Sequence, residues 1–378
     1  MSSIRKNIQQ KLEKRKAENA FRFLHVSQNN QIDFASNDYL GLAKEVVAKE
    51  QVEQVLKEGS TGSRLITGTS KMHIDLEDQL AQHYYAESAL LYNSGYDANI
   101  GVLSAVLTRH HTVIIDEYVH ASIKDGVRLS EAKMLKFKHN DLSDLKRLLE
   151  QQEDTTNVLL VVESIYSMDG DEADLIALID LKHQYGFELM VDEAHSNGLY
   201  GPNGEGLLCF LGIQDEVFIR VNTFGKALGS HGAVVLGSKE LKDYLINFSR
   251  SLIYTTSLPE IALNSIKIKH DKMSKQKHNK FQISNLCNLF NFLIEDSEVD
   301  WEKKGVGPIF SLIIPGNEAV KAVANLLQAQ GFDIRPILSP TVKLGEERLR
   351  IIIHAFNKEE EVRSLVNSLE EAYLSSGI

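Results

Sequence analysis

The run Val158-Leu159-Leu160-Val161-Val162 is short, continuous and apolar, and the polar pair Glu163-Ser164 follows it directly. Such a run is typical of a strand that is covered on both faces, as in a mainly parallel sheet. Similar runs recur along the chain and alternate with amphipathic stretches. We predict strands at 89–92, 112–115, 189–191, 217–221 and 233–236, and helices at 73–85, 97–108, 141–152 and 174–185. This alternation predicts an α/β fold with a mainly parallel sheet between helices.

The pattern changes beyond about residue 255. A lysine-rich helical stretch at 265–280 precedes predicted strands at 309–314 and 349–353 and predicted helices near 317–330 and from about 358. This is the pattern of a smaller C-terminal α+β lobe. We therefore predict an N-terminal helix (3–20) and arm in residues 1–40, a large α/β domain in residues 41–255, and a small α+β domain in residues 256–378.

Composition excludes several kinds of partner. The chain has 378 residues, 43% of them hydrophobic, and a formal net charge of −11, which argues against nucleic acid or an anionic membrane as the main partner. No uninterrupted apolar segment reaches the length of a membrane span. Cys209 and Cys287 have no metal-ligand spacing and provide no disulfide framework. A cytoplasmic location is the default expectation.

A lysine and an aspartate that follow predicted strands indicate a cofactor. Lys226 lies in Thr223-Phe224-Gly225-Lys226-Ala227-Leu228-Gly229, after the run 217–221. A lysine in this setting can form a Schiff base with an aldehyde. Asp192 ends the run 189–191, where its carboxylate can hold a pyridinium nitrogen protonated. Together the two residues predict a site for pyridoxal 5′-phosphate (PLP).

Other polar residues lie where an open parallel sheet binds ligands, at the carboxyl ends of its strands. Gly95 and Tyr96 open a predicted helix, whose backbone N–H groups can bind a phosphate. His120 follows the strand at 112–115, where its imidazole can stack on a flat ring. Ser167 and His195 follow the strands at 158–162 and 189–191. Each residue alone has an ordinary structural explanation, so the prediction depends on their joint placement.

Two other site types fit the sequence poorly. Asp192-Glu193-Ala194-His195 is also a metal-and-ATP motif of helicases, but that interpretation requires a phosphate loop upstream. The nearest glycine-rich segment, 62–70, has the wrong glycine spacing and no lysine after its second glycine. Adjacent His110 and His111 cannot both face one ion from a regular element, and H-E-x-x-H is absent from the sequence. We predict no metal site.

From about residue 10 to 375 the chain resembles the α-oxoamine synthase family of fold-type I PLP enzymes. Short motifs support the resemblance through their number and their order in the chain. They are Ser36-Asn37-Asp38-Tyr39-Leu40-Gly41-Leu42, Gly59-Ser60-Thr61-Gly62-Ser63-Arg64, Asn93-Ser94-Gly95-Tyr96, His120-Ala121-Ser122, His139-Asn140-Asp141, Ser167-Met168-Asp169-Gly170-Asp171, Asp192-Glu193-Ala194-His195 and Thr223-Phe224-Gly225-Lys226. The fold implied is that of a fold-type I PLP-dependent transferase.

The resemblance also implies roles for individual residues. Catalytic roles fall to Lys226, His120, Asp192 and His195; cofactor contacts to these four and to Gly95, Tyr96, Ser167 and Thr223; and substrate contacts to Arg22, His120 and Thr341. One position departs from the family. Leu338 occupies the place of an arginine that binds the carboxylate of the amino acid, and Arg335, three residues earlier, is the nearest candidate for that role.

The implied reaction is a decarboxylative condensation of an amino acid, L-alanine by the nearest resemblance, with an acyl thioester of coenzyme A or acyl carrier protein. A homodimer is expected by the same resemblance. Segments 223–226, 232–236, 252–257 and 340–342 resemble the branch that serves biotin synthesis, whereas 120–128 resembles the glycine-acetylating branch at least as well. Two other possibilities are weaker. A non-catalytic partner subunit would have lost Lys226 or Asp192, and an enzyme of aldol cleavage would lack Arg22.

Overall fold

The structure is a computed structural model and describes residues 2–22, 24, 26, 30–45, 56–275 and 277–377. Contacts divide the chain into two compact units. Unit 1 comprises residues 1–36, 168–171 and 281–378, and unit 2 comprises residues 37–167 and 172–280. Parts of the predicted arm (23, 25 and 27–29) and residue 276 of the predicted helical stretch 265–280 lie outside the described residues. The predicted three-part domain division stays a prediction.

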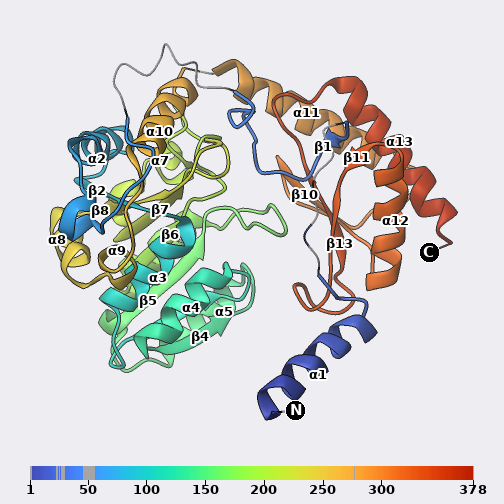
Figure 1. The fold of residues 1–378 in the computed structure, drawn as a ribbon. Helices are drawn as coiled ribbons and strands as arrows, with labels where there is room; N and C mark the ends of the chain where they lie inside the picture. Colours follow the sequence, from blue (N-terminus) through green and yellow to red (C-terminus); the bar gives the residue numbers. More distant parts are fainter. Residues whose placement is uncertain are drawn as a thin grey trace. The chain divides into compact units, whose positions relative to one another are not determined.

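Unit 2 is built on a seven-stranded sheet with the strand order β2-β8-β7-β6-β5-β3-β4 (Figure 1). Its strands are β2 (Ser88–Tyr92), β3 (Thr112–Asp116), β4 (Lys133–Phe137), β5 (Val158–Glu163), β6 (Glu188–Asp192), β7 (Ile219–Thr223) and β8 (Ala233–Gly237). β8 runs antiparallel to both of its neighbours, while β7, β6, β5, β3 and β4 pair in parallel. The prediction of a mainly parallel sheet is confirmed.

Helices of unit 2 cover this sheet. They are α2 (Lys71–His83), α3 (Gly95–Val106), α4 (Ala121–Ser130), α5 (Leu142–Glu150), α6 (Leu175–Tyr185), α7 (Leu207–Leu211), α8 (Lys239–Phe248), α9 (Arg250–Ile253) and α10 (Glu260–Met273), with short turns at Arg64–Gly68, Thr155–Asn157 and Gln214–Glu216. Every residue of β5 is buried, so both faces of the sheet are covered. Burying one such Val or Leu side chain contributes about 1.5–3 kcal/mol.

Two strand predictions need correction. The run 217–221 was predicted as a strand, but β7 begins two residues later, at Ile219, and Val217 is the residue that ends the short turn Gln214–Glu216. β4 was not predicted, because its lysines interrupt the apolar pattern of Lys133–Phe137. β4 is the edge strand of the sheet, and charged residues are common on such edges.

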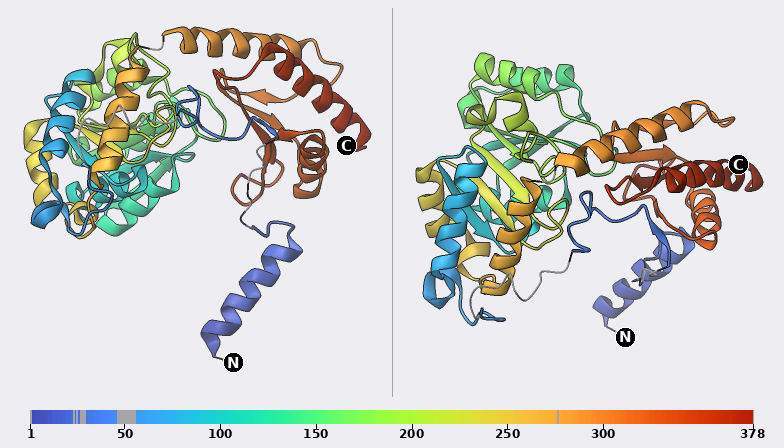
Figure 2. Two further views of the ribbon diagram at one scale, coloured as in Figure 1. Left: turned by 45° about the horizontal axis from the view of Figure 1, so that its top comes forward. Right: turned by 90° about the horizontal axis from the view of Figure 1, so that it is seen from above.

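Unit 1 contains a four-stranded antiparallel sheet, with the order β12-β13-β10-β9, and a parallel pair, β1-β11. Its elements are α1 (Ser3–Ala17), β1 (Ile32–Asp33), most of α11 (Lys277–Glu295), β9 (Lys303–Lys304), β10 (Ile309–Ile313), α12 (Asn317–Ala329), β11 (Phe332–Asp333), β12 (Arg335–Ile337), β13 (Arg348–Ile352) and α13 (Glu359–Ser375). α1 buries none of its residues and projects from the rest of unit 1 (Figure 2). The predicted α+β lobe is therefore confirmed.

No helix in the described part of the chain has the length and apolar character needed to cross a membrane.

Candidate active site

The residues predicted to bind the cofactor line one cavity of unit 2, with a volume of about 290 Å³. Its lining includes Gly95, Tyr96, His120, Ser167, Asp192, His195, Thr223 and Lys226. Most of these residues lie at or just after the carboxyl end of a strand, and Gly95 and Tyr96 open α3 after β2. The sheet thus brings together side chains that are distant in the sequence.

Asp192 is the last residue of β6 and is buried, with 5% of its surface exposed. Its Oδ1 atom accepts a hydrogen bond from the backbone N–H of Ala194 at 2.9 Å, and its Oδ2 atom accepts one from Asn99 Nδ2 at 2.8 Å. A carboxylate held at both oxygens is fixed in orientation. It can present a defined face to a positively charged ring nitrogen.

A second buried carboxyl group lies beside Asp192. Glu163 ends β5 and pairs with Asp192 in the register of β5 and β6. Burial, with Asp192 alongside, raises the pKa of Glu163 to about 8. Glu163 Oε1 also accepts a hydrogen bond from the His120 backbone N–H at 2.5 Å. At neutral pH Glu163 is therefore mainly a neutral acid.

His120 caps the N-terminus of α4. Its Nδ1 atom accepts a hydrogen bond from the Ser122 backbone N–H at 3.3 Å and lies 2.7 Å from Ser122 Oγ. Loss of solvation in the cavity lowers the pKa of His120 and outweighs the opposing effect of Asp192. His120 is therefore a neutral imidazole near pH 7, and Tyr96 meets it edge-on with 6.4 Å between ring centroids.

His195 lines the cavity and is buried, with 3% of its surface exposed. Its Nδ1 atom is 2.6 Å from the hydroxyl of Tyr39, which is fully buried. Tyr39 belongs to the motif 36–42, which therefore contributes to the site the hydroxyl that contacts His195. The contact fixes the imidazole plane of His195.

The loop after β7 positions Lys226 through its neighbours. Phe224, Ala227 and Leu228 are buried and anchor the loop, while the Lys226 side chain is half-buried and lines the cavity. The backbone N–H of Gly229 closes a turn onto the Lys226 carbonyl at 2.7 Å. The apolar anchors thus set the place from which the lysine amine enters the cavity.

A phosphate fits the end of the cavity formed by α3 and β7. Thr223 Oγ1 is buried and has no hydrogen-bond partner among the residues that the structure describes. Gly95 stands at the N-terminus of α3, and a Cβ atom there would lie 2.6 Å from Thr223 Cγ2. A hydroxyl donor, a close backbone approach and a helix N-terminus are the features that bind phosphate groups. The residues present therefore fit PLP, because amine, carboxylate and phosphate partners line one cavity.

Of the predicted substrate residues, His120 lies in unit 2, and Arg22, Thr341 and Arg335 lie in unit 1. Arg22 Nη2 donates a hydrogen bond to Thr341 Oγ1 at 2.7 Å, so these two residues contact each other. Arg335 Nε lies 2.8 Å from Asp333 Oδ1 in an ion pair. The sequence analysis missed Arg350, which lies directly opposite Arg335 in the antiparallel register of β12 and β13. Opposite residues of such a pair leave the same face of the sheet, so Arg350 is a second cation beside Arg335.

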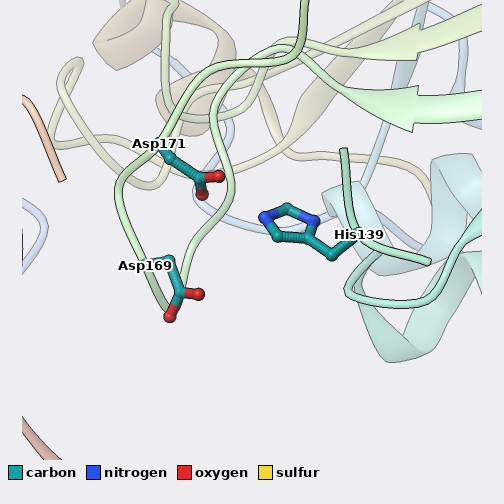
Figure 3. A group of neighbouring side chains, drawn as sticks. All are labelled: His139, Asp169 and Asp171. Carbon is teal, nitrogen blue, oxygen red and sulfur yellow. The ribbon is translucent and has the colours of Figure 1, made fainter. Parts of the chain in front are cut away.

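Two other motif segments have structural partners. His139 of unit 2 lies 2.9 Å from Asp116 and stacks on Tyr118, with 4.3 Å between centroids. In unit 1, the loop 168–171 presents Asp169 and Asp171 (Figure 3). Asp169 forms a buried ion pair with Arg348.

Comparison with known proteins places the chain in a family. The family model described as aminotransferase class I and II matches residues 29–369. An 8-amino-7-oxononanoate synthase of Emericella nidulans is 36% identical over 97% of this chain and 95% of its own length. A crystal structure of 8-amino-7-oxononanoate synthase from Francisella tularensis is 26% identical, covers 93% of this chain and all of its own, and has a TM-score of 0.81. A serine palmitoyltransferase from S. paucimobilis with a PLP–myriocin adduct shares the fold, with a TM-score of 0.88 at 23% identity over both full chains.

The chain belongs to the aminotransferase class I and II family and, within it, to the α-oxoamine synthases. The predicted fold class, a fold-type I PLP-dependent transferase, is confirmed.

Proposed function

We propose that this protein is a PLP-dependent acyltransferase that condenses L-alanine with a pimeloyl thioester, releasing CO2 and forming 8-amino-7-oxononanoate for biotin synthesis. The observation that supports this most strongly is the single cavity in which Lys226, Asp192, His120, His195 and Thr223 meet. The relatives from Emericella nidulans and Francisella tularensis, which match over more than nine-tenths of the chain, carry the name of this activity.

The residues of the cavity have distinct proposed tasks. Bound PLP supplies an electron sink for a carbanion next to the amino nitrogen. Lys226 would hold the cofactor through its Nζ atom, and the free amine at that atom would take the α-proton of the amino acid. Asp192 holds a proton on the ring nitrogen, and Thr223 with the N-terminus of α3 binds the phosphate. His120 stacks on the ring, and His195 and Ser167 contact its oxygens.

The substrate contacts are proposed from unit 1. Arg22 and Thr341, which hydrogen-bond to each other, bind the acyl donor. Arg335 binds the amino-acid carboxylate, and its ion pair with Asp333 makes Arg350 the alternative. We also propose that the enzyme is a cytoplasmic homodimer. Light scattering on the purified protein measures its molar mass and thereby tests the dimer.

The experiment that tests this function crosses three amino acids with two acyl groups. L-Alanine, glycine and L-serine are each supplied with acetyl and pimeloyl thioesters, on coenzyme A and on acyl carrier protein. We expect CO2 release and 8-amino-7-oxononanoate with alanine and a pimeloyl donor. Preference for glycine with acetyl coenzyme A would identify a glycine C-acetyltransferase. No condensation with any pair would contradict the proposal.

A further inference from the structure

A series of hydrogen bonds joins Asp192 and His120, the two residues proposed to contact the nitrogen and the face of the cofactor ring. Asn99 Nδ2 donates to Asp192 Oδ2 at 2.8 Å and to Ser122 Oγ at 3.0 Å. Ser122 Oγ lies 2.7 Å from His120 Nδ1. These hydrogen bonds therefore connect Asp192 through Asn99 and Ser122 to His120, and all four residues belong to unit 2. Neither Asn99 nor Ser122 has a task in the reaction proposed above.

The hydrogen bonds of this series have a fixed direction. The Asp192 carboxylate only accepts, so the Asn99 amide must turn its NH2 group toward it. His120 Nδ1 accepts from the Ser122 backbone N–H, so the Ser122 hydroxyl donates to the same nitrogen and accepts from Asn99. The remaining proton of the neutral His120 ring is therefore on Nε2. These hydrogen bonds thus set both the orientation of the Asp192 carboxylate and the tautomer of the His120 imidazole.

These hydrogen bonds depend on the close packing of α3 against α4. Asn99 lies four residues after Gly95 in α3, on the face that opens into the cavity. Ser122 is in the first turn of α4. Gly126, one turn later in α4, lets the two helices approach, because a Cβ atom there would lie 2.9 Å from the Asn99 carbonyl oxygen. Helix α4 can therefore place Ser122 within reach of Asn99.

The burial of Asn99 indicates that its amide is present for the hydrogen bonds that its NH2 group donates. Asn99 is 2% exposed and Ser122 is fully buried. Within the described part of the chain, Asn99 Oδ1 has no hydrogen-bond partner. An unsatisfied buried carbonyl costs stability, and an apolar residue at this position would avoid that cost. A residue selected for packing alone would not hold an amide in this way.

We propose that Asn99 and Ser122 are positioning residues that fix the Asp192 carboxylate and the His120 ring relative to each other around the cofactor. This inference rests on the proposed function, because that function assigns Asp192 to the ring nitrogen and His120 to the ring face. Asn99 holds Asp192 Oδ2 while the Ala194 backbone holds Oδ1, so the carboxylate cannot rotate. Ser122 holds His120 in the tautomer whose Nδ1 atom is an acceptor.

The test compares Asn99→Ala and Ser122→Ala with a matched control, Gln79→Ala. Gln79 Nε2 donates to Asp271 Oδ1 at 2.7 Å, so it also makes an amide-to-carboxylate hydrogen bond, between α2 and α10 and outside the cavity lining. Each purified holoenzyme is measured for PLP content, visible circular dichroism of the bound cofactor, kcat, KM for alanine and unfolding midpoint. Circular dichroism reports the setting of the ring independently of activity.

We expect Asn99→Ala to keep its PLP, to change the visible circular dichroism, and to lower kcat by roughly 10- to 100-fold while KM changes by less than about twofold. Ser122→Ala should change the same spectrum with a smaller loss of kcat, since the contact between Asn99 and Asp192 remains. Gln79→Ala should match the wild type in spectrum and kcat, whatever it loses in stability.

The proposal is overturned if Asn99→Ala and Gln79→Ala share the wild-type spectrum and kcat, since both residues would then be structural. Should Asn99→Ala not fold, Ser122→Ala decides, and a wild-type spectrum there would equally overturn the link. Failure of the proposed function is separate. It would appear as a wild-type protein that binds no PLP or forms no condensation product.

Discussion

Arg22 and Thr341 are 319 residues apart in the chain, yet Arg22 Nη2 donates a hydrogen bond to Thr341 Oγ1 at 2.7 Å. The contact brings the arm that follows α1 to the loop between β12 and β13 within unit 1. Both residues were predicted separately to bind substrate. Their contact supports the proposal that they act on the same ligand.

Arg22→Ala should weaken use of a pimeloyl thioester by roughly 10- to 100-fold, because a charged hydrogen bond to the far carboxyl group is typically worth about 1.5–3 kcal/mol. Acetyl transfer and the KM for alanine should not change. The measurement is kcat/KM for both donors, with Arg5→Ala on the exposed α1 as control. Equal loss with both donors would place Arg22 at the carrier, and no loss with either would remove it from donor binding.

Asp192→Asn should leave PLP bound and lower kcat by at least about 100-fold, since a neutral amide cannot hold the ring nitrogen protonated. The phosphate contacts of Thr223 and the amine of Lys226 are untouched by the change. PLP content and steady-state turnover are measured on the same preparation. Near-normal turnover would show that Asp192 has a structural role.

Thr223→Val should separate cofactor binding from stability. Thr223 Oγ1 is buried and has no partner in the ranges of the chain that the structure describes, so its removal should leave the free energy of unfolding of the cofactor-free protein unchanged or raised by about 1 kcal/mol. Loss of the phosphate contact should weaken PLP binding by roughly tenfold. The control is Thr155→Val, whose hydroxyl donates to the Tyr185 carbonyl and whose loss should lower stability alone. Unchanged PLP affinity in Thr223→Val would contradict the phosphate assignment.

Glu163 should make the stability of the cofactor-free protein depend on pH. Its pKa is raised from 4.5 to about 8 by burial and by Asp192. Between these values the folded protein keeps a proton that the unfolded chain has lost. The stabilising contribution of Glu163 is therefore fully present below pH 4.5 and is lost as the pH rises through about 8.

Glu163→Gln stays neutral at every pH, so it should reduce the fall in the free energy of unfolding over this range by up to about 1.4 kcal/mol per pH unit. Denaturant unfolding at several pH values measures the slope, with the exposed Glu188→Gln as control. A slope equal to that of the wild type would show that Glu163 is ionised in the folded state.

The fold followed from local patterns where strands are buried on both faces. The runs at 89–92, 112–115, 158–162 and 233–236 lie within β2, β3, β5 and β8, because continuous apolar residues have no other stable place. β4 could not be predicted in the same way, since Lys133 and Lys136 interrupt its apolar residues and such a short mixed segment resembles a solvated loop. The edge position depends on strand order, which local pattern does not determine.

The site could be predicted where a reactive side chain comes at or just after the end of a predicted strand, as Asp192 and Lys226 do. Asn99 and Ser122 were missed because their contact depends on how closely α3 and α4 pack at Gly126. One signal was available, since Asn99 follows Gly95 by four residues and shares its helix face. Arg350 was missed because it becomes a neighbour of Arg335 only through the antiparallel register.

The central claim is that Lys226 holds PLP in the cavity of unit 2. Borohydride reduction of the holoenzyme, followed by peptide mapping, tests it most directly, because reduction makes the link between cofactor and lysine permanent. We predict a single labelled peptide that contains Lys226, and no label in Lys226→Ala. Label on another lysine, such as the half-buried Lys124 of α4, or no label in the wild type, would contradict the claim.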